Sequence, residues 1–496
     1  MVRESRTAGA LGALWRLAAI VWEGSLFGRL SREAARAGAA WPSSLAGTAA
    51  RRAARRLEAL RPWAAGSALL RAAPLDRLPA YLAMAFPLLP TSLDVALIWA
   101  AAVALLLRRW ARGQALLRRP AAAWPLGLFA AAVAISALAS VTPLPSLVSL
   151  VLWLSQFLLF LFMFEAVTSP AAVRGVQWSL ALGAALTSVI GLAQAYAGIQ
   201  TPRWIDEQAN PGLSTRVFSV FDDPNALASY FTATLPFIAA LVLSERRWLL
   251  KLGALTLLGV TLAGDLYTFS RGGWLAAVLA FAILGSLWRP RYFPLAWAAM
   301  AAALAALVAA GPHAIQVRLE SLASGQDTSI QYRFAIWTGV LHMVRAYLWT
   351  GVGLGQSAFA AVYPHFMIAG TEAAHAHDIY LELLAETGLP GLLLFLWLAA
   401  ALAFTFLRAA LRRVASGAEG TRLAAAAALA ACVALLFEGL TDNVWFSPRA
   451  AMGLWLGAGL GAACARLLRA AGAPGEAPAE AQKEAAEGGA ACASST

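Results

Sequence analysis

The hydrophobic residues of this chain are gathered into blocks of about 20 residues that are separated by short basic loops. A block of that length, folded as a helix, crosses the hydrocarbon core of a bilayer. Of the 496 residues, 60% are hydrophobic and 13% are charged, whereas a soluble domain is about half apolar and a quarter charged. Polar and apolar residues do not alternate as in a membrane β-barrel. The sequence therefore predicts an all-α, polytopic transmembrane helical bundle.

The charged residues predict the orientation of this bundle. The formal net charge is +12, and the arginines lie mainly in the N-terminal stretch and in short loops, as the positive-inside rule requires of cytoplasmic segments. We therefore expect no nucleic-acid partner. The three cysteines are scattered, so they suggest neither a disulfide framework nor a metal cluster. The basic clusters placed in the cytoplasm are 51–56, 108–119, 245–247, 289–291 and 408–413.

The apolar blocks between these clusters give about twelve spans with both termini cytoplasmic. This count requires 79–107 to be a hairpin broken near residues 87–91; a re-entrant segment is the alternative. The other spans are expected near 121–141, 143–166, 174–198, 226–244, 248–269, 273–288, 292–310, 379–407, 423–441 and 450–468.

Three regions follow from this pattern. Residues 1–75 form a basic, amphipathic N-terminal cytoplasmic extension that lies on the anionic leaflet, or alternatively a solvated and partly disordered one. Residues 76–470 form the transmembrane domain, with a large outer-face loop at 312–377 that contains short helices. Residues 471–496, rich in Ala, Gly, Glu and Pro, are expected to be a disordered cytoplasmic tail.

Two arginines, Arg216 and Arg271, fall on the outer face, where the orientation bias disfavours them. A guanidinium there can bind phosphate oxygens through paired N–H donors. Alternatively, Arg271, in FSRGGW, snorkels to the headgroups or caps a helix C-terminus, and Arg216 forms a salt bridge with Asp222 or Asp223. Asp223 precedes Pro224 and is also suited to begin the next helix.

His377 closes the predicted outer loop in the sequence H-A-H-D and can exchange a proton near neutral pH. Asp378, Glu382 and Glu386 follow at intervals of four residues and therefore share one helical face. Asp378 and Glu382 lie near enough in sequence to tune or orient the imidazole of His377. Glu386 would lie about two turns into the membrane, which is costly unless it faces a wet cavity or a partner. A purely structural His377 is the alternative. Without a third ligand, the H-x-H pair of His375 and His377 does not predict a metal site.

The remaining motifs limit the chemistry. Arg333, in QYRFAIW, is expected on an amphipathic helix at the membrane surface, in a supporting role. No D-x-D pair, P-loop or G-x-S-x-G elbow is present, and GVGLG at 351–355 lacks the βαβ context of a dinucleotide site. We therefore expect no cofactor and no metal.

Four motifs together resemble the O-antigen ligase/polymerase superfamily over residues 79–468: STRVFSVFDDPNALASYF, FSRGGWLA, RFAIWTGVLHMV followed by GVGLGQSAF, and AHDIYLELLAETGLPGLLLF. The resemblance implies a C-type glycosyltransferase that is inverting and metal-independent, at the outer face of the bacterial cytoplasmic (inner) membrane. The donor would be a saccharide on undecaprenyl pyrophosphate. Ligases transfer it to a lipid A core in lipopolysaccharide biosynthesis, polymerases to another lipid-linked repeat, and related members to proteins or wall polymers.

The resemblance also implies roles for individual residues. Arg216 and Arg271 match the two arginines thought to hold the donor pyrophosphate, and His377 matches the candidate general base; His375 receives no role. The implied partners are the lipid-linked donor, a glycan, lipid or protein acceptor, and membrane lipids. Residues 1–75 fall outside the shared core, and the motifs do not separate ligase from polymerase.

Two other classes remain as alternatives. A transporter or flippase of a lipid-linked saccharide would place polar residues at mid-membrane in several spans, and a scaffold protein would not need His377. The polar residues of this chain gather instead at one predicted surface. That distribution favours a transferase.

Overall fold

The computed structural model describes residues 77–199, 216–289 and 328–471, with single gaps at 116 and 222. It also describes residue 75 and a few isolated residues between 291 and 305. The predicted extension 1–75, most of the expected span 292–310 and residues 472–496 of the predicted tail lie outside this part of the chain.

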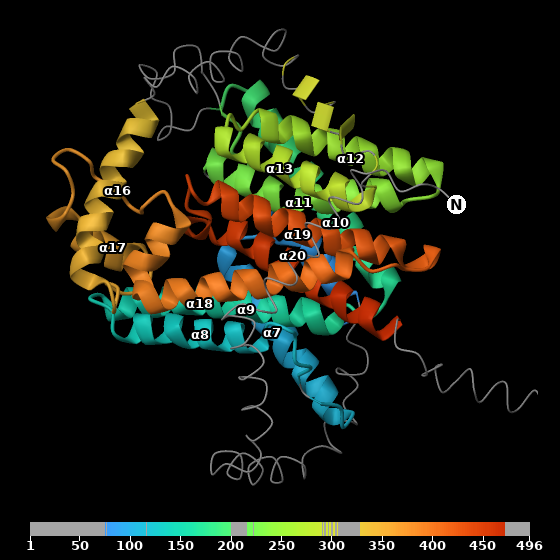
Figure 1. Cartoon of the computed structure of the whole chain (residues 1–496), viewed down its shortest axis with the longest axis horizontal. Helices are drawn as coiled ribbons and strands as arrows, with labels where there is room; N and C mark the ends of the chain where they lie inside the picture. The colour runs from blue at the N-terminus through green and yellow to red at the C-terminus, as the bar shows by residue number, and fades with distance from the viewer. Residues whose placement is uncertain are drawn as a thin grey trace, which may run out of the picture.

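Within the described ranges every regular element is a helix, as predicted. The longer helices form a bundle, drawn horizontally in Figure 1. The helices before the predicted outer loop are α6 (Leu78–Ala85), α7 (Thr91–Ala111), α8 (Ala123–Leu138), α9 (Pro143–Ala166), α10 (Pro170–Tyr196), α11 (Pro224–Ser244), α12 (Trp248–Leu266) and α13 (Arg271–Trp288). Those that follow are α16 (Thr328–Tyr347), α17 (Gln356–Val362), η3 (Tyr363–His365), α18 (Ile379–Ala410), η4 (Ser416–Ala418), α19 (Glu419–Glu438), η5 (Val444–Phe446) and α20 (Pro448–Ala471).

Nine of the described helices are long and apolar enough to cross a membrane: α7, α9 to α13, and α18 to α20. The chain is therefore a multi-pass helical membrane protein, as the sequence predicts. Helix α8 is apolar but has only 16 residues. The predicted number of about twelve spans is not reached in the described residues.

The break in the first apolar block lies where the sequence predicts it, because α6 ends at Ala85 and α7 begins at Thr91. Helix α6 has eight residues, which rise about 12 Å, whereas the hydrocarbon core is about 30 Å thick. Helix α6 alone therefore cannot form the first limb of a membrane-crossing hairpin. It packs against α10 instead.

Helices α11 and α19 form the centre of the bundle and pack against each other, with α13 and α20 beside them. Residues 423–428 of α19, one leucine and five alanines, are fully buried. Small side chains allow membrane helices to approach closely, since packing rather than hydrophobicity drives their association. Helices α7 and α12 are the least buried of the nine candidate spans and lie at the periphery.

The two ends of the bundle differ in their charged residues. The last residue of α13, Trp288, lines a cavity of about 620 Å³ together with four arginines that lie in, or next to, the predicted cytoplasmic loops. These arginines, Arg174, Arg246, Arg247 and Arg289, come from three segments far apart in the sequence. The first residue of the same helix, Arg271, lies at the opposite end. Two of the basic clusters that the sequence assigns to the cytoplasm, 245–247 and 289–291, therefore lie at one end of the bundle.

Helices α16 and α17 extend from the other end of the bundle, beside the start of α18 (Figure 1). Their apolar faces form a second core that includes Ile336, Met343, Phe359 and Tyr363. This arm supports the segment that carries His377, because the Trp337 indole N–H donates to the carbonyl of Ala376 at 3.0 Å.

Helix α18 is interrupted at Gly388, which has φ 66° and ψ −177°. The glycine-rich segment 351–355 packs against the backbone just before this break: Val352 N donates to the Ala385 carbonyl at 2.8 Å, and Gly353 N donates to the Glu386 carbonyl at 3.2 Å. A Cβ atom on Gly351 would lie 2.2 Å from the carbonyl oxygen of Glu386, so glycine is required for this approach. Residues 379–387 therefore form a short helix at the end of the bundle rather than the first turns of one continuous span.

Candidate functional site

A polar cavity of about 70 Å³ brings together residues from five segments of the chain. Both arginines singled out in the sequence line it, and so does Arg333 of α16. Its other lining residues are Asn225, Phe269, Ser270, Gly272, Glu438, Thr441 and Asp442. Three guanidinium groups and two carboxyl groups therefore meet in one small space.

Arg216 is fixed in this cavity by neutral oxygen atoms. Its Nε donates to the Thr268 carbonyl at 2.8 Å, and one terminal nitrogen donates to Oδ1 of Asn225 at 2.7 Å. Burial lowers the pKa of Arg216 to about 10, so the group stays protonated at neutral pH. Arg216 and Asp223 attract each other electrostatically, while the Asp223 carboxylate accepts from Asn225 N and begins α11 before Pro224. Asp222 lies outside the described residues.

Arg271 is the first residue of α13, which Ser270 caps by accepting a hydrogen bond from Gly273 N. Arg271 therefore lies at the N-terminus of its own helix. The N-terminus of a helix carries partial positive charge, which favours anions and disfavours a cation. An arginine at this position adds to the positive potential of the helix end, so the two together favour a bound anion.

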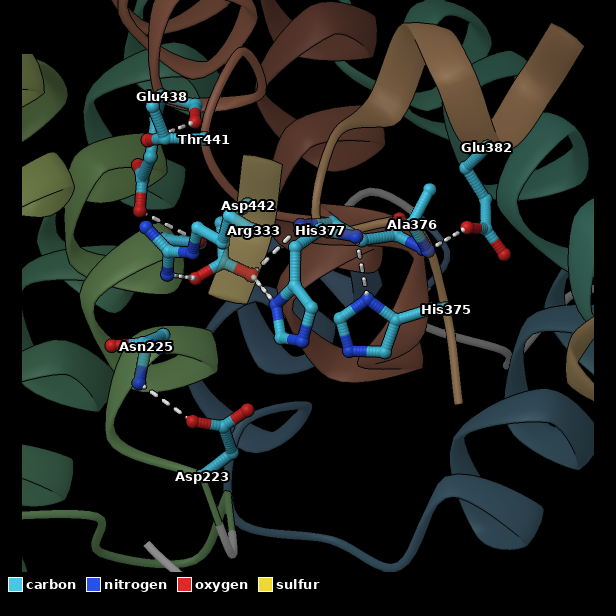
Figure 2. Close-up of polar contacts among 12 residues, drawn as sticks. Asp223, Asn225, Arg333, His375, Ala376, His377, Glu382, Glu438, Thr441 and Asp442 are labelled. Atoms are coloured by element: carbon cyan, nitrogen blue, oxygen red, sulfur yellow. Dashed lines mark hydrogen bonds and ion pairs between the residues drawn. The ribbon is translucent and has the colours of Figure 1, made fainter. Parts of the chain in front are cut away.

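Asp442 links the arginine cluster to His377 (Figure 2). One carboxylate oxygen lies 3.7 Å from a guanidinium nitrogen of Arg333, and the other lies 3.8 Å from Nδ1 of His377. Burial opposes the charge of Asp442, but its contact with His377 and the charge of Arg333 outweigh that effect and hold its pKa below the usual range. An anionic Asp442 therefore faces the imidazole ring. The 3.8 Å separation is a charge contact rather than a hydrogen bond.

The acidic residues expected beside His377 bind the main chain around it instead. Asp378 caps α18 by accepting from Tyr380 N and Leu381 N, each at 2.8 Å. Glu382 accepts from Ala376 N at 2.6 Å (Figure 2). These carboxylates therefore fix the backbone before and after His377 and do not contact its ring.

Glu386 likewise binds backbone, because its carboxylate accepts from Gly355 N at 2.8 Å, just before α17. Its burial at 6% exposure fits the expectation of a polar environment rather than lipid. Asp442 is the residue that sequence reasoning missed. The available signal was its place in TDNVWFSPR, a predicted outer turn on the same face as His377.

The rings of the two histidines of the H-A-H-D sequence are in contact, with centroids 3.9 Å apart and planes tilted by 48°. His377 N donates to Nδ1 of His375 at 3.1 Å. Burial, together with the neighbouring His377, lowers the pKa of His375 to about 3, so His375 is neutral at physiological pH. Since Nδ1 accepts a hydrogen bond, the proton of neutral His375 is on Nε2.

Backbone strain is concentrated at this site. The non-glycine residues with positive φ in the described part of the chain are Ser219, Phe269 and His377, with φ of 54°, 52° and 50°. Ser219 lies three residues after Arg216, Phe269 lies two residues before Arg271, and the third residue is His377 itself. Such conformations cost about 1–3 kcal/mol each and persist where the surrounding structure enforces them. No group of three or more His, Cys, Asp or Glu side chains in the described ranges is arranged to hold a metal.

Residues 254–396 match the family model described as O-Antigen ligase. The matched range begins in α12 and ends in α18; it contains Arg271, Arg333 and His377, whereas Arg216 and Asp442 lie on either side of it. A comparison with curated proteins finds no match. The family match confirms the resemblance to the O-antigen ligase superfamily inferred from the motifs.

Proposed function

Because residues 254–396 match the O-Antigen ligase family model within a multi-pass helical bundle, we propose that this protein is a membrane glycosyltransferase of the O-antigen ligase type. It moves a saccharide from undecaprenyl pyrophosphate to an acceptor hydroxyl group. The reaction takes place at the outer face of the bacterial cytoplasmic membrane, with both termini of the chain in the cytoplasm. The supporting observation is the contact of His377 with Asp442, which lines the same cavity as Arg216, Arg271 and Arg333.

The arginines bind the pyrophosphate of the donor. Arg216 is buried, charged and held by two hydrogen bonds, so little reorganisation is needed when the leaving group gains negative charge. Arg271 adds a second fork of N–H donors at a helix N-terminus. Fixed positive charge of this kind stabilises the departing pyrophosphate, a role that metal ions fill in other transferases, and the proposed reaction needs no metal.

His377 acts as the general base toward the acceptor. The acceptor oxygen forms a bond to the anomeric carbon while the bond from that carbon to the pyrophosphate oxygen breaks, and the electron pair leaves with undecaprenyl pyrophosphate. The hydroxyl proton passes to Nε2 of His377. Asp442, facing Nδ1 of His377 at 3.8 Å, stabilises the imidazolium that forms. Attack opposite the leaving group inverts the anomeric configuration.

The test uses the full-length protein in nanodiscs, with an undecaprenyl-pyrophosphate oligosaccharide and a panel of acceptors. The release of undecaprenyl pyrophosphate is followed with and without EDTA. We expect acceptor-dependent, EDTA-insensitive release that is lost in His377→Ala and retained in the control variant His342→Ala. His342 is an exposed histidine of α16 and does not line the site.

The outcomes distinguish the alternatives. Release with a lipid A core acceptor identifies a ligase, and release with a second lipid-linked repeat identifies a polymerase. If no acceptor promotes release, but intact lipid-linked saccharide moves between leaflets, the protein is a transporter and the proposal is wrong. Equal activity of His377→Ala and wild type would remove His377 from the reaction.

A further inference from the structure

A second cavity, of about 180 Å³, lies beside the histidine pair and is distinct from the arginine cavity. His375 lines it, and its walls come from α9, the start of α17, the first part of α18 and η5. The lining residues are Ser149, Leu152, Trp153, Gln156, Gly355, Gln356, His375, Glu382, Glu386, Asn443, Trp445, Phe446 and Pro448. In Figure 2, His375 and Glu382 lie on one side of His377, and Asp442 and Arg333 lie on the other.

The two cavities differ in charge. The first contains three arginines, whereas the second is lined by two carboxyl groups and by no lysine or arginine. The carboxyl groups of Glu382 and Glu386, which both line this cavity, are hydrogen-bonded to each other. An anionic phosphate therefore meets three cations in the first cavity and none in the second. A neutral group with many hydroxyls suits the second.

Two residues that line the second cavity, Gln156 and Trp445, carry buried polar atoms without hydrogen-bond partners in the described part of the chain. Gln156 is 3% exposed, and its Oε1 has no hydrogen-bond partner among the described residues; the same holds for the indole Nε1 of Trp445. Burying such a group without a partner costs about 1–3 kcal/mol. A sugar that draws the Gln156 and Trp445 side chains toward it would give both atoms a partner, and it would also accept from Nε2–H of His375.

Aromatic rings complete the lining. Trp153 and Trp445 lie 5.0 Å apart between ring centroids, and Phe446 packs on His375 at 4.3 Å. Aromatic walls with a few convergent polar groups are typical of small-molecule sites. An apolar cavity of about 150 Å³ holds a benzene ring, so the second cavity has room for one six-membered ring.

We propose that this second cavity is a monosaccharide subsite that binds the terminal sugar of the acceptor. This inference rests on the proposed transferase function. The subsite would hold the sugar by its hydroxyls and its apolar ring face, with the reacting hydroxyl directed toward His377 and the donor pyrophosphate beyond it. The acceptor hydroxyl and the leaving group then approach the anomeric carbon from opposite sides, as inversion requires.

The first test is kinetic and uses Gln156→Leu, which keeps the size of the side chain and removes its amide. We expect the KM for the acceptor to rise about tenfold, the effect of one hydrogen bond lost in a binding site. The donor KM and kcat should stay near wild type. Gln177→Leu is the matched control, because Gln177 is equally buried but lies at the other end of the bundle.

The second test measures sugar binding without transfer, so it remains informative if the proposed function is wrong. Saturation-transfer NMR is recorded on the full-length protein with methyl glycosides of glucose, galactose and N-acetylglucosamine. We expect at least one glycoside to receive saturation from wild type and from Gln177→Leu, with a several-fold smaller signal for Gln156→Leu and Trp445→Phe. Trp445→Phe keeps a ring and removes the indole N–H.

Two results would overturn the subsite. One is wild-type protein that binds none of the glycosides. The other is unchanged sugar binding and unchanged acceptor KM in both Gln156→Leu and Trp445→Phe. Sugar binding in the absence of any transfer would instead leave the subsite in place and contradict the transferase.

Discussion

The carboxylate of Asp442 lies 3.8 Å from Nδ1 of His377, although 64 positions separate the two residues in the sequence. Asp442 follows α19, and His377 precedes α18. The two helices pack against each other, and Ile379 N donates to the Gly439 carbonyl at 2.8 Å. The chain segments that carry the acid and the histidine are thus joined through their backbones.

Removing the charge of Asp442 should slow the reaction without weakening donor binding. Asp442→Asn keeps the shape of the side chain but no longer stabilises the imidazolium of His377. We expect kcat to fall about 100-fold, in the range of general-base effects, with the donor KM changed less than threefold. Steady-state transfer rates in nanodiscs provide the measurement. Glu419→Gln, at the opposite end of the bundle, is the control, and equal kcat in wild type and Asp442→Asn would contradict the role of Asp442.

Replacing Arg271 by lysine should remove most activity, because one ammonium group cannot supply the paired donors of a guanidinium. We expect kcat/KM for the donor to fall about 10–100-fold, equivalent to one or two bidentate contacts. The same substitution at Arg289, an arginine at the predicted cytoplasmic end, should leave kcat/KM unchanged. Similar losses in both variants would point to a general effect of lysine on folding, which protein yield after purification would reveal.

His375 should make the protein less stable in mild acid. Its pKa is lowered from 6.5 to about 3 in the folded state, so the unfolded state binds the proton first as the pH falls. The stability contributed by neutral His375 is therefore fully present above about pH 6.5 and is lost below it, by about 1.4 kcal/mol per pH unit.

His375→Asn removes this titration and keeps an acceptor for His377 N. Thermal unfolding in detergent between pH 7 and pH 5 tests the difference. The unfolding temperature of wild type should fall more steeply over this range than that of the variant. Parallel slopes for the two proteins would show that His375 is not the group responsible.

Gly388 should not tolerate a side chain. Gly388→Ala combines a positive φ with a Cβ atom 2.7 Å from the carbonyl oxygen of Trp349, and we expect it to destabilise the protein by about 2–4 kcal/mol. Gly370→Ala is the matched control, since Gly370 also has positive φ but has no atom within 4 Å of its Cβ position. Gly370→Ala measures the cost of the backbone strain alone, which we expect to be about 1 kcal/mol. Equal unfolding temperatures for the two variants would mean that the backbone of residues 349–351 does not pack closely against Gly388.

The hydrophobic pattern predicted most of the helices, because each apolar block and its flanking turn are local properties of the chain. The hairpin turn at Thr142 and the start of α11 after Asp223 follow from such local signals. The break at Gly388 escaped prediction, since the leucines on both sides make the block look continuous. It depends on the approach of Gly351 from a distant segment.

The same distinction holds for the site. Arg216, Arg271 and His377 could be singled out from charge on the predicted outer face, and the structure brings them to one end of the bundle. The partner of His377 could not be identified, because nearness in sequence favoured Asp378, which serves as a helix cap. The packing of α18 against α19 brings Asp442 next to His377 instead. Such contacts between distant helices leave no pattern in a single sequence.

The left-handed backbone at Ser219, Phe269 and His377 has a consequence for heating experiments. Packing of the bundle must hold these three residues in place, so the strained loops should relax at temperatures where the buried helices are still intact. Catalysis would then disappear before circular dichroism detects any loss of helix. Enzyme activity would therefore report the loss of native structure at a lower temperature than helix content does. A lipid that stabilises the packing of the bundle would first lengthen the half-life of activity on heating.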